Sequence, residues 1–403
     1  MLLSIAKTLG KNVNTISSAR RYYSSLPWKQ VHIPVLLDEV VKHLNPKDGG
    51  TYCDLTFGEG GYTKALLDNY DCKVIAIDQD PTAYEKALQM ADIYKDRLYP
   101  ILGKFGNVGR LVNKKVDGIM MDIGVSSGQI ETPERGFSYK LDGPLDMRMF
   151  SRGREQQQGV FKDEQALLNK SISAYEIVNF FSREQIADII YQYGGDRLSR
   201  KIADAIVTAR QEAPIETTSS LATIIQKACP QPRWQRGNDD MVRNSAARTF
   251  QAFRIYINDE LGELEKALSA SEYLLVPDGR LAVVTFHSLE DRIVKNFMYH
   301  CAGKRSLKTA EHNQFDLKRQ ASRDYKKAIK KGDTSFSRKQ LVEKDEKVDP
   351  SLELIPKKHI EPTEDEIENN PRSRSAKLRV AKRTDAPALA PFGEPEFIFD
   401  EDE

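Results

Sequence analysis

The chain has 403 residues, of which 40% are hydrophobic and 30% are charged, and its formal net charge is only +1. A chain of this length can form two domains around a sizeable core. No apolar run approaches the ~20 residues that cross a bilayer, so we expect no membrane partner. The four cysteines lie far apart and form no Cys-x-x-Cys pair, which disfavours a metal site of the structural zinc type and a disulfide framework.

The first 37 residues contain no Asp or Glu, but they carry five Lys and Arg residues and many Ser and Thr residues. A basic, acid-free and hydroxyl-rich start is typical of a mitochondrial transit peptide. We assign residues 1–28 to such a peptide, with removal just downstream of Arg20–Ser25, and expect the protein in the mitochondrial matrix. A basic tail that targets nothing is the alternative.

Strand and helix signals alternate from residue 31 onward. The expected elements are a strand at Tyr52–Phe57, a helix at Thr63–Asn69, a strand at Lys73–Ile77, a helix at Pro81–Tyr94, and strands at Leu98–Leu102 and Gly118–Asp122. This alternation predicts an α/β fold with a doubly wound, Rossmann-like parallel sheet. We assign residues 31–152 and 241–300 to this domain.

A glycine-rich turn follows the first strand, at Gly58, Gly60 and Gly61. Asp54 ends that strand, and Asp78 ends the next one. Acids at the carboxyl ends of adjacent parallel strands face the crevice in which α/β proteins bind ligands, and an acid about twenty residues after the turn suits ribose hydroxyls. The turn alone could serve packing, but the combination predicts a nucleotide-like ligand.

Two common nucleotide ligands fit this turn poorly. A nicotinamide cofactor would require a third glycine where the chain has Thr63, and the Gly-Lys-Ser/Thr that closes a P-loop is absent. S-adenosylmethionine has a ribose but no phosphates, so its site needs bare backbone and a ribose-binding acid without a helix for pyrophosphate. We therefore expect S-adenosylmethionine, with a nicotinamide oxidoreductase as the disfavoured competitor.

The fourth strand ends at Asp122, and Gln129 follows shortly after it. The next stretch, residues 133–149, is dense in Arg, Asp and Met. One interpretation is a lid over the substrate, in which Arg135 and Arg148 contact phosphate. The other is an ordered loop whose arginines pair internally.

Helical signals without intervening strands then predict an inserted all-helical domain at residues 153–240. The α/β pattern resumes with one long amphipathic helix at Ala246–Leu275 and a buried strand at Arg280–Phe286. His287 follows this strand. It is either a functional residue or a capping and packing residue.

The C-terminal region is rich in charge. Residues 301–370 contain few apolar side chains, which predicts disorder over much of this stretch. Residues 371–383 are expected to return to the core as a final strand, and their Lys and Arg side chains either face solvent or contact nucleic acid. Residues 384–403 are expected to form a flexible acidic tail.

Several segments resemble the MraW-type family of ribosomal RNA cytosine-N4 methyltransferases, and specifically a mitochondrial member. The matching segments are His32–Val40, Asp54–Gly61, Asp122–Gln129, Glu134–Ser138, Asp142–Met149, Arg248–Ile255, Ser288–Lys295 and Asn370–Arg379. They span residues 32–300 and the C-terminal piece, and several are peculiar to this family. The resemblance implies a class I methyltransferase sheet that uses S-adenosylmethionine, with the inserted helices as a substrate-recognition domain.

The resemblance also implies a substrate and a set of cofactor residues. The substrate would be a cytidine of small-subunit ribosomal RNA, free or in an assembling subunit, so that the reaction contributes to ribosome maturation. The implied cofactor residues are Gly60, Gly61 and Tyr62 at the methionine end, Asp78 at the ribose, Phe105 and Asp122 beside the adenine, and Gln129 completing the pocket.

Methyl transfer to an exocyclic amine depends mainly on alignment of nitrogen, methyl and sulfur, and such positioning can supply ~7–11 kcal/mol. A group that accepts the amine N–H would help to free the nitrogen lone pair. Asp122 or an adjacent main-chain carbonyl is the first candidate for this acceptor, and His287 is the second, as orienter or proton acceptor. The Asp/Asn-Pro-Pro-aromatic turn of many amino-directed methyltransferases is absent.

The chain departs from the family pattern at a few positions. Tyr62 replaces a His, Gly128 replaces the Pro of a Ser-Ser-Pro-Gln turn, and Gly195 and Asp196 replace a pair of Glu residues. None of these changes removes a required acid. The Tyr62 departure is the best support for the alternative function, a non-catalytic RNA-binding factor for ribosome assembly.

Overall fold

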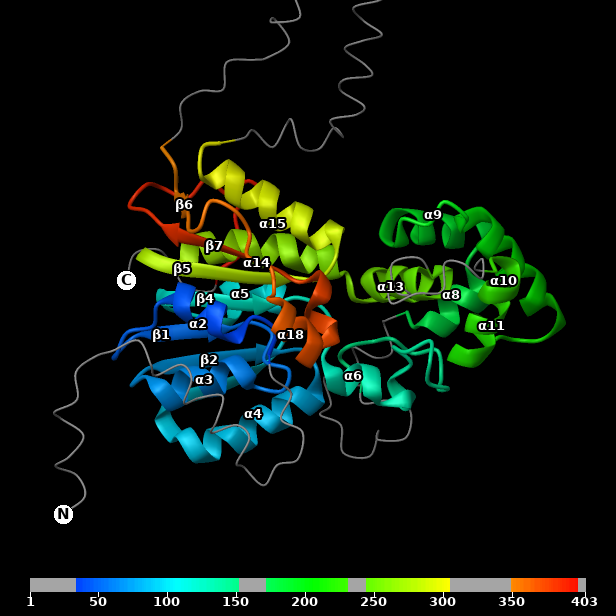
Figure 1. Cartoon of the computed structure of the whole chain (residues 1–403), viewed down its shortest axis with the longest axis horizontal. Helices are drawn as coiled ribbons and strands as arrows, with labels where there is room; N and C mark the ends of the chain where they lie inside the picture. Colours follow the sequence, from blue (N-terminus) through cyan, green and yellow to red (C-terminus); the bar gives the residue numbers. More distant parts are fainter. Residues whose placement is uncertain (1–33, 152–171, 231–243, 305–348, 398–403) are drawn as a thin grey trace, which may run out of the picture.

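The computed structural model describes residues 34–151, 172–230, 244–304 and 349–397. They form a sheet-based domain with a lobe of helices at its side (Figure 1). The expected transit peptide at residues 1–28 lies outside the described residues. So do the beginning of the predicted insertion, the stretch 305–348 and the last six residues of the acidic tail.

The sheet has seven strands in the order β3-β2-β1-β4-β5-β7-β6. The strands are β1 (Thr51–Asp54), β2 (Lys73–Asp78), β3 (Leu98–Leu102), β4 (Val116–Asp122), β5 (Leu275–Thr285), β6 (Leu352–Leu354) and β7 (Lys377–Arg383). The first five are mutually parallel, whereas β7 is antiparallel to both β5 and β6. Strand order reverses between β1 and β4, so their carboxyl ends border the crevice in which such sheets bind ligands. The predicted fold class is confirmed.

Two apolar layers cover the faces of the sheet. One face packs on α2 (Leu37–Leu44), α3 (Gly61–Asn69) and α4 (Pro81–Tyr94). The other face packs on α5 (Val108–Leu111), α14 (Glu260–Leu274) and α15 (Ser288–Cys301). The strands bury side chains on both faces, as parallel strands between helices do. None of the helices in the described ranges is long and apolar enough to span a membrane.

The helical lobe has a separate apolar core. Its helices are α8 (Ala174–Phe180), α9 (Arg183–Gly194), α10 (Ser199–Glu212), α11 (Thr218–Ala228) and α13 (Ser245–Asn258). Leu145 and Met147, from the segment that follows β4, are also buried in this core. The segment that follows β4 therefore packs in the core of the lobe.

The prediction of a single long helix at Ala246–Leu275 is wrong, because the structure has two helices there. The stretch is divided at Asp259, whose φ of 51° is left-handed, into α13 and α14. Phe250 and Phe253 of α13 are buried in the lobe core, so this helix belongs to the lobe rather than to the sheet domain. Apolar periodicity continues across the break, and it could not reveal that the two halves face different cores.

The predicted disorder of residues 301–370 is also wrong in its last part. Leu352–Leu354 forms β6, which pairs with β7 at the sheet edge, and Glu364–Asn369 forms α18. Helix α18 contacts the start of α2, because the Leu36 amide donates to Glu366 at 2.7 Å. Two short elements with few apolar side chains gain their stability from the sheet edge and from this contact.

Residues 384–397 pack on the fold, which corrects the expectation of a flexible tail. Phe392 stacks on Phe297 with ring centroids 5.7 Å apart. The buried Glu272 carboxylate accepts from the amides of Leu389 at 2.7 Å and Ala390 at 3.0 Å, and from the Ser351 hydroxyl. This tail carries few charges before its last residues, and its aromatic side chains cover α14 and α15.

Candidate active site

Three neighbouring strands, β2, β1 and β4, each end in an aspartate: Asp78, Asp54 and Asp122. The parallel register aligns the strands side by side, with Asp54 beside Ala76 of β2 and Met120 of β4. We call these three residues the strand-tip carboxylates. The sequence predicts an aspartate at the end of each of these strands, and the structure brings the three together at one edge of the sheet.

Asp54 is fully buried at the centre of this edge. Its carboxylate accepts from the Thr63 hydroxyl at 2.7 Å and from the Thr56 amide at 3.3 Å. Burial raises the pKa of Asp54 to about 6, although these hydrogen bonds act in the opposite direction. Thr63 stands where a nicotinamide fingerprint would have its third glycine, and here it serves to anchor this acid.

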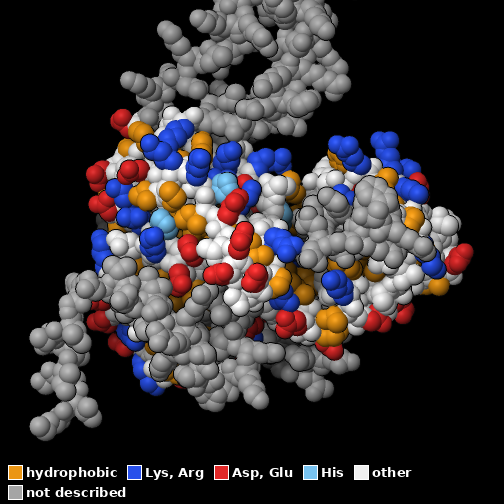
Figure 2. Space-filling view, in the orientation of Figure 1, with side chains coloured by type: hydrophobic (Ala, Val, Ile, Leu, Met, Phe, Trp, Pro, Cys, Tyr) orange, Lys and Arg blue, Asp and Glu red, His pale blue; other side chains and the backbone are white. Residues whose placement is uncertain are grey.

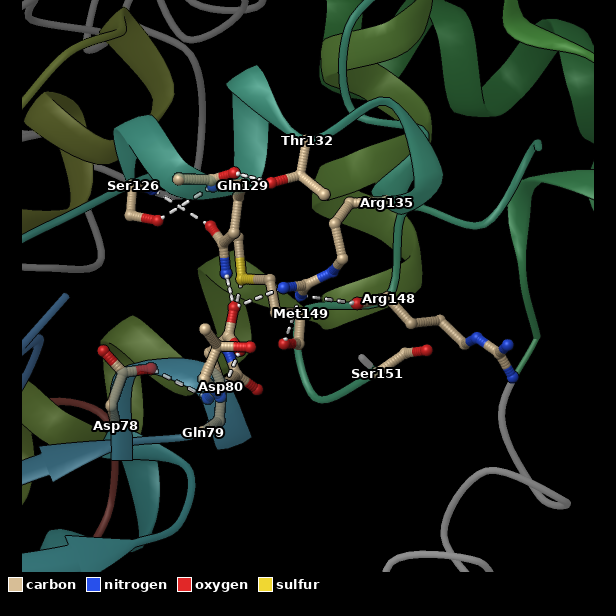
Figure 3. Close-up of polar contacts among 12 residues, drawn as sticks. Asp78, Gln79, Asp80, Ser126, Gln129, Thr132, Arg135, Arg148, Met149 and Ser151 are labelled. Carbon is tan, nitrogen blue, oxygen red and sulfur yellow. Dashed lines mark hydrogen bonds and ion pairs between the residues drawn. The ribbon is translucent and has the colours of Figure 1, made fainter. Parts of the chain in front are cut away.

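Asp78 joins the glycine-rich turn to the start of α4. One carboxylate oxygen accepts from the Gly58 amide at 2.8 Å. The other accepts from the Asp80 amide, also at 2.8 Å (Figure 3). Burial raises the pKa of Asp78 to about 7. Each carboxylate oxygen has two lone pairs, so both oxygens retain a position for a further donor such as a ribose hydroxyl.

Asp122 has the most perturbed carboxyl of the three. Burial, and then the nearby charges of Asp54 and Glu290, raise its pKa to about 8, whereas the nearby Tyr62 hydroxyl acts in the opposite direction. Its Oδ1 is buried and has no hydrogen-bond partner within the described part of the chain. A buried acceptor without a donor is costly in a folded protein, and an acid with a strongly perturbed pKa in a crevice indicates function.

The glycines of the turn have different roles. Gly60 has a φ of 77°, and a Cβ there would lie 2.6 Å from the Phe57 ring. At Gly61, a Cβ would lie 2.1 Å from Pro34. Both glycines are therefore required by packing. At Gly58, whose φ is 52°, a Cβ would meet nothing closer than 3.8 Å, so this backbone is the part of the turn with space above it.

Tyr62 is buried in the first turn of α3, and its hydroxyl donates to the Val35 carbonyl. Burial, followed by the charges of Asp122 and Asp54, raises the pKa of Tyr62 well above its usual value. Tyr62 therefore lies among the strand-tip carboxylates, as its place in the predicted cofactor set requires. Its side chain is held by protein groups on more than one side.

Phe105 and Gln129 complete the predicted cofactor set. Phe105 begins a short 3-10 turn after β3 and is mostly buried in the core. Gln129 lies in α6 (Ser127–Glu131), where its Oε1 accepts from the Ser126 amide and its Nε2 donates to Asp80 at 2.9 Å. The structure thus places Gln129 beside Asp80 at the start of α4, whereas Phe105 lies after the end of β3.

The two arginines expected to reach phosphate pair internally, so the second interpretation of residues 133–149 is correct. Arg135 is buried, and it donates to Asp80 at 2.7 Å and to the Met149 carbonyl at 2.8 Å (Figure 3). Arg148 forms an ion pair with Asp146. The Arg135–Asp80 pair joins positions 55 residues apart, and no motif in the sequence links the two.

A cavity of about 370 Å³ opens beside these groups, between α4, α6 and the turn at Pro133–Arg135. It is bordered by Gly58, Asp80, Gln129 and Arg135, together with the Lys86–Glu59 ion pair. Of the predicted cofactor residues, only Gln129 lines this cavity. The cavity therefore adjoins the strand-tip carboxylates on their α4 and α6 side.

His287 follows β5 and lies at the same edge of the sheet. Its Nε2 is 2.7 Å from Oε1 of Glu290, which is fully buried in the first turn of α15. Oε2 of Glu290 accepts from the Phe286 amide at 2.9 Å. Glu290 was not predicted from the sequence, yet it accepts from the His287 amide at 3.3 Å and also contributes to the raised pKa of Asp122.

The basic C-terminal strand is largely paired within the fold. Arg379 binds Asp291 at 2.8 Å, Lys382 lies within 3.2 Å of Asp278 and of Glu353, and Arg383 donates to backbone carbonyls. Arg372 reaches Glu131 of α6 at 2.9 Å. These contacts hold the C-terminal segment in the fold along the length of β7, so its cations are engaged by protein groups.

Comparison with known proteins places this site in a family. Ribosomal RNA small subunit methyltransferase H of Paramagnetospirillum magneticum is 43% identical over 363 residues, which cover 89% of this chain and 98% of the relative. The protein of the same name from Rickettsia bellii strain RML369-C is 42% identical, with 88% and 99% covered. A model described as the MraW methylase family matches residues 29–331 and 320–384. The chain therefore belongs to the MraW methylase family.

Proposed function

We propose that this chain transfers a methyl group from S-adenosylmethionine to the N4 amine of a cytidine in small-subunit ribosomal RNA. Membership of a methylase family gives the reaction class. The names of the relatives specify small-subunit ribosomal RNA as their substrate. The observation that supports the site most directly is the group of strand-tip carboxylates with the partnerless Oδ1 of Asp122 among them.

The residues at this edge of the sheet fit the cofactor. When bound, S-adenosylmethionine supplies a methyl group on a positively charged sulfur. Burial raises the pKa of each strand-tip carboxylate, so a cation among them would favour their ionised forms. Asp78 would hold the ribose, the turn at Gly58–Tyr62 would hold the methionine end, and Phe105 and Gln129 would border the adenosyl group.

Asp122 is the proposed acceptor for the amine of the cytidine. Its Oδ1 has no donor from the described protein groups, so it can take an N–H from a substrate without breaking an existing bond. The Asp122 amide is fixed by the Thr56 hydroxyl at 2.6 Å, which holds the carboxylate in place. His287, held by Glu290, is the proposed positioning residue on the β5 side.

The cofactor role of Asp78 can be tested by calorimetric titration with S-adenosylmethionine. Asp78→Ala should weaken binding roughly 10- to 100-fold, because hydrogen bonds to a charged group contribute ~1.5–3 kcal/mol. Asp96→Ala is the matched control, since Asp96 is exposed at the opposite edge of the sheet. Unchanged affinity in Asp78→Ala would rule out the ribose role.

The substrate can be tested by mass spectrometry of nucleosides from small-subunit ribosomal RNA of mitochondria, with and without this protein. We expect N4-methylcytidine to disappear when the protein is absent and to return with the wild type but not with Asp122→Asn. Return with Asp122→Asn would instead support a non-catalytic assembly factor. Incubating the purified protein with naked RNA and with isolated subunits would identify the form that is methylated.

We also propose a mitochondrial matrix location, supported by the acid-free, basic first 37 residues. A fusion of residues 1–37 to a fluorescent protein should enter mitochondria. Substituting Arg20 and Arg21 by Glu should keep the fusion outside, and entry of that variant would contradict the proposal.

A further inference from the structure

The proposed function requires a surface that binds RNA, and the predicted basic strand does not supply it, because its charges are paired. Helix α15 offers a different surface. It begins at Ser288, next to His287 at the edge of the site, and runs away from it along the sheet. Figure 2 shows Lys and Arg side chains gathered over the region where Figure 1 places α15.

The outer face of α15 carries a stripe of two cations and one aromatic ring at helical spacing. Arg292, Lys295 and Tyr299 follow one another at intervals of three and four residues, and they therefore lie on one side of the helix. From Arg292 to Tyr299 this stripe extends about 10 Å. Lys304, just beyond the end of α15, continues it.

Tyr299 holds two of these cations together. Nζ of Lys295 lies 5.7 Å from the centre of the Tyr299 ring, and Nζ of Lys304 lies 5.9 Å from it. Each such contact contributes only ~0.5–1 kcal/mol at an exposed site. The contacts place two like charges around one ring, an arrangement that favours a bound anion.

No acidic side chain in the described ranges pairs with Arg292, Lys295 or Lys304. The nearest acid on the exposed part of the helix, Asp291, is already bound to Arg379. Surface cations are ordinarily interspersed with acids, so an unpaired stripe that starts at the site is unusual.

A second segment adds to this surface. His359 contributes to the charge around Asp291, so the loop that carries it lies beside the start of α15. This loop presents Lys357 and Lys358, both exposed and without an ion pair to any described acid. Basic side chains therefore flank the first turns of α15 as well as following its length.

We propose that the outer face of α15, with Arg292, Lys295, Tyr299 and Lys304, binds the phosphate backbone of the RNA substrate next to the cytidine in the site. This inference rests on the proposed function for the identity of the polyanion. Cations bind phosphates without reading the base, so the stripe orients the strand, and the base is selected in the site.

The test measures RNA affinity by fluorescence anisotropy with a labelled oligonucleotide of the small-subunit ribosomal RNA. Arg292→Glu/Lys295→Glu should weaken binding at least tenfold at low salt. It should also reduce the slope of log affinity against log salt by about one for each residue changed. Lys42→Glu/Lys73→Glu is the control of equal charge, since both lysines are exposed and Lys73 begins β2 at the opposite edge of the sheet.

Equal losses in the two double variants would overturn the proposal, because net charge alone would then explain them. Binding of a labelled polyglutamate peptide as tightly as RNA, with the same loss in Arg292→Glu/Lys295→Glu, would also overturn it in favour of an acidic protein partner. Tyr299→Leu should lose a smaller part of the affinity, whereas Tyr299→Phe, which keeps the ring, should retain it.

Failure of this inference is distinguishable from failure of the proposed function. Each variant is titrated with S-adenosylmethionine, and its affinity for the cofactor should equal that of the wild type. If the wild type methylates RNA and the charge reversal on α15 leaves RNA affinity intact, the surface is wrong and the function stands. If the wild type binds RNA through α15 but transfers no methyl group, the surface stands and the function is wrong.

Discussion

Two buried acidic sites in this protein differ in how their carboxylates are satisfied. At the C-terminal tail, Glu272 is fully buried and accepts hydrogen bonds from Ser351, Leu389 and Ala390. At the edge of the sheet, Asp122 is enclosed by other acids and retains an oxygen without a partner. Glu272 therefore serves the fold, whereas the partnerless oxygen of Asp122 is a cost to the fold, as expected for the proposed acceptor of a substrate N–H.

The same contrast separates the arginines. Arg135 and Arg383 donate to protein carbonyls or carboxylates and hold distant segments together. Arg292 has no such acceptor among the described residues. Charge composition alone cannot distinguish these roles, because the two kinds of arginine differ only in what lies beside them in the fold.

The largest effect is expected for Asp122→Asn. This change replaces the carboxylate by a neutral amide, which accepts the amine N–H more weakly and cannot take its proton, while keeping the size of the side chain, and methyl transfer should fall ~10²- to 10⁴-fold. Single-turnover methylation with saturating cofactor measures it. If Asp122→Asn transfers methyl groups at the wild-type rate, Asp122 is not the acceptor, and it does not differ in function from Glu272.

Glu272→Met should act on stability alone. It leaves the Ser351 hydroxyl and two backbone amides without their acceptor, so the free energy of unfolding should fall by roughly 2–4 kcal/mol. Urea unfolding followed by circular dichroism measures this loss. Activity per folded molecule should stay within about twofold of the wild type, and a large loss of activity would show that the tail also shapes the site.

Much of the fold and part of the site were predictable from the sequence. Asp54, Asp78 and Asp122 could be located because each ends an apolar strand that follows a recognisable turn or helix. The break at Asp259 could not be predicted, since Phe250, Phe253 and Leu264 keep the helical period while they pack in different cores. The strand β6 at the sheet edge has only three residues, Leu352–Leu354, which is too short to show a pattern of its own.

Contacts between residues far apart in the chain also could not be predicted from the sequence. Arg135 was singled out, but its partner Asp80 lies on another element, and only the fold brings the two together. Glu290 was likewise read as part of a family segment and not as the residue that holds His287. A residue type and its position in a motif predict which interactions a side chain can make. The residue that lies beside it in the fold decides which of these interactions it makes.

Asp122→Asn should also change how the free energy of unfolding depends on pH. Burial raises the pKa of Asp122 to about 8 in the folded chain, far above the ~3.9 of an unfolded Asp. The folded state thus binds more protons between these values, and the free energy of unfolding falls as pH rises from 4 to 8. Asp122→Asn removes this contribution, so the variant should be more stable than the wild type at pH 8, and the difference should shrink as the pH falls toward 4.

Urea unfolding at pH 5 and pH 8 measures that difference. Asp96→Asn is the control, because Asp96 is exposed and its replacement should leave stability unchanged at both pH values. A variant at Asp122 that is less stable than the wild type at pH 8 would mean that this carboxylate supports the fold, as Glu272 does.

The smallest effect is expected for Tyr62→Phe. Asp122 can accept the amine N–H fully only when ionised, so kcat/KM should rise with pH through the pKa of Asp122 in the free enzyme. The nearby Tyr62 hydroxyl, which Tyr62→Phe removes, lowers that pKa. Its removal should move the rising limb upward by ~0.4–1 pH unit, the equivalent of one neutral hydrogen bond. Tyr70→Phe, at the other end of α3, should leave the profile in place. If Tyr62→Phe also leaves it in place, Asp122 is not the group whose ionisation controls methyl transfer.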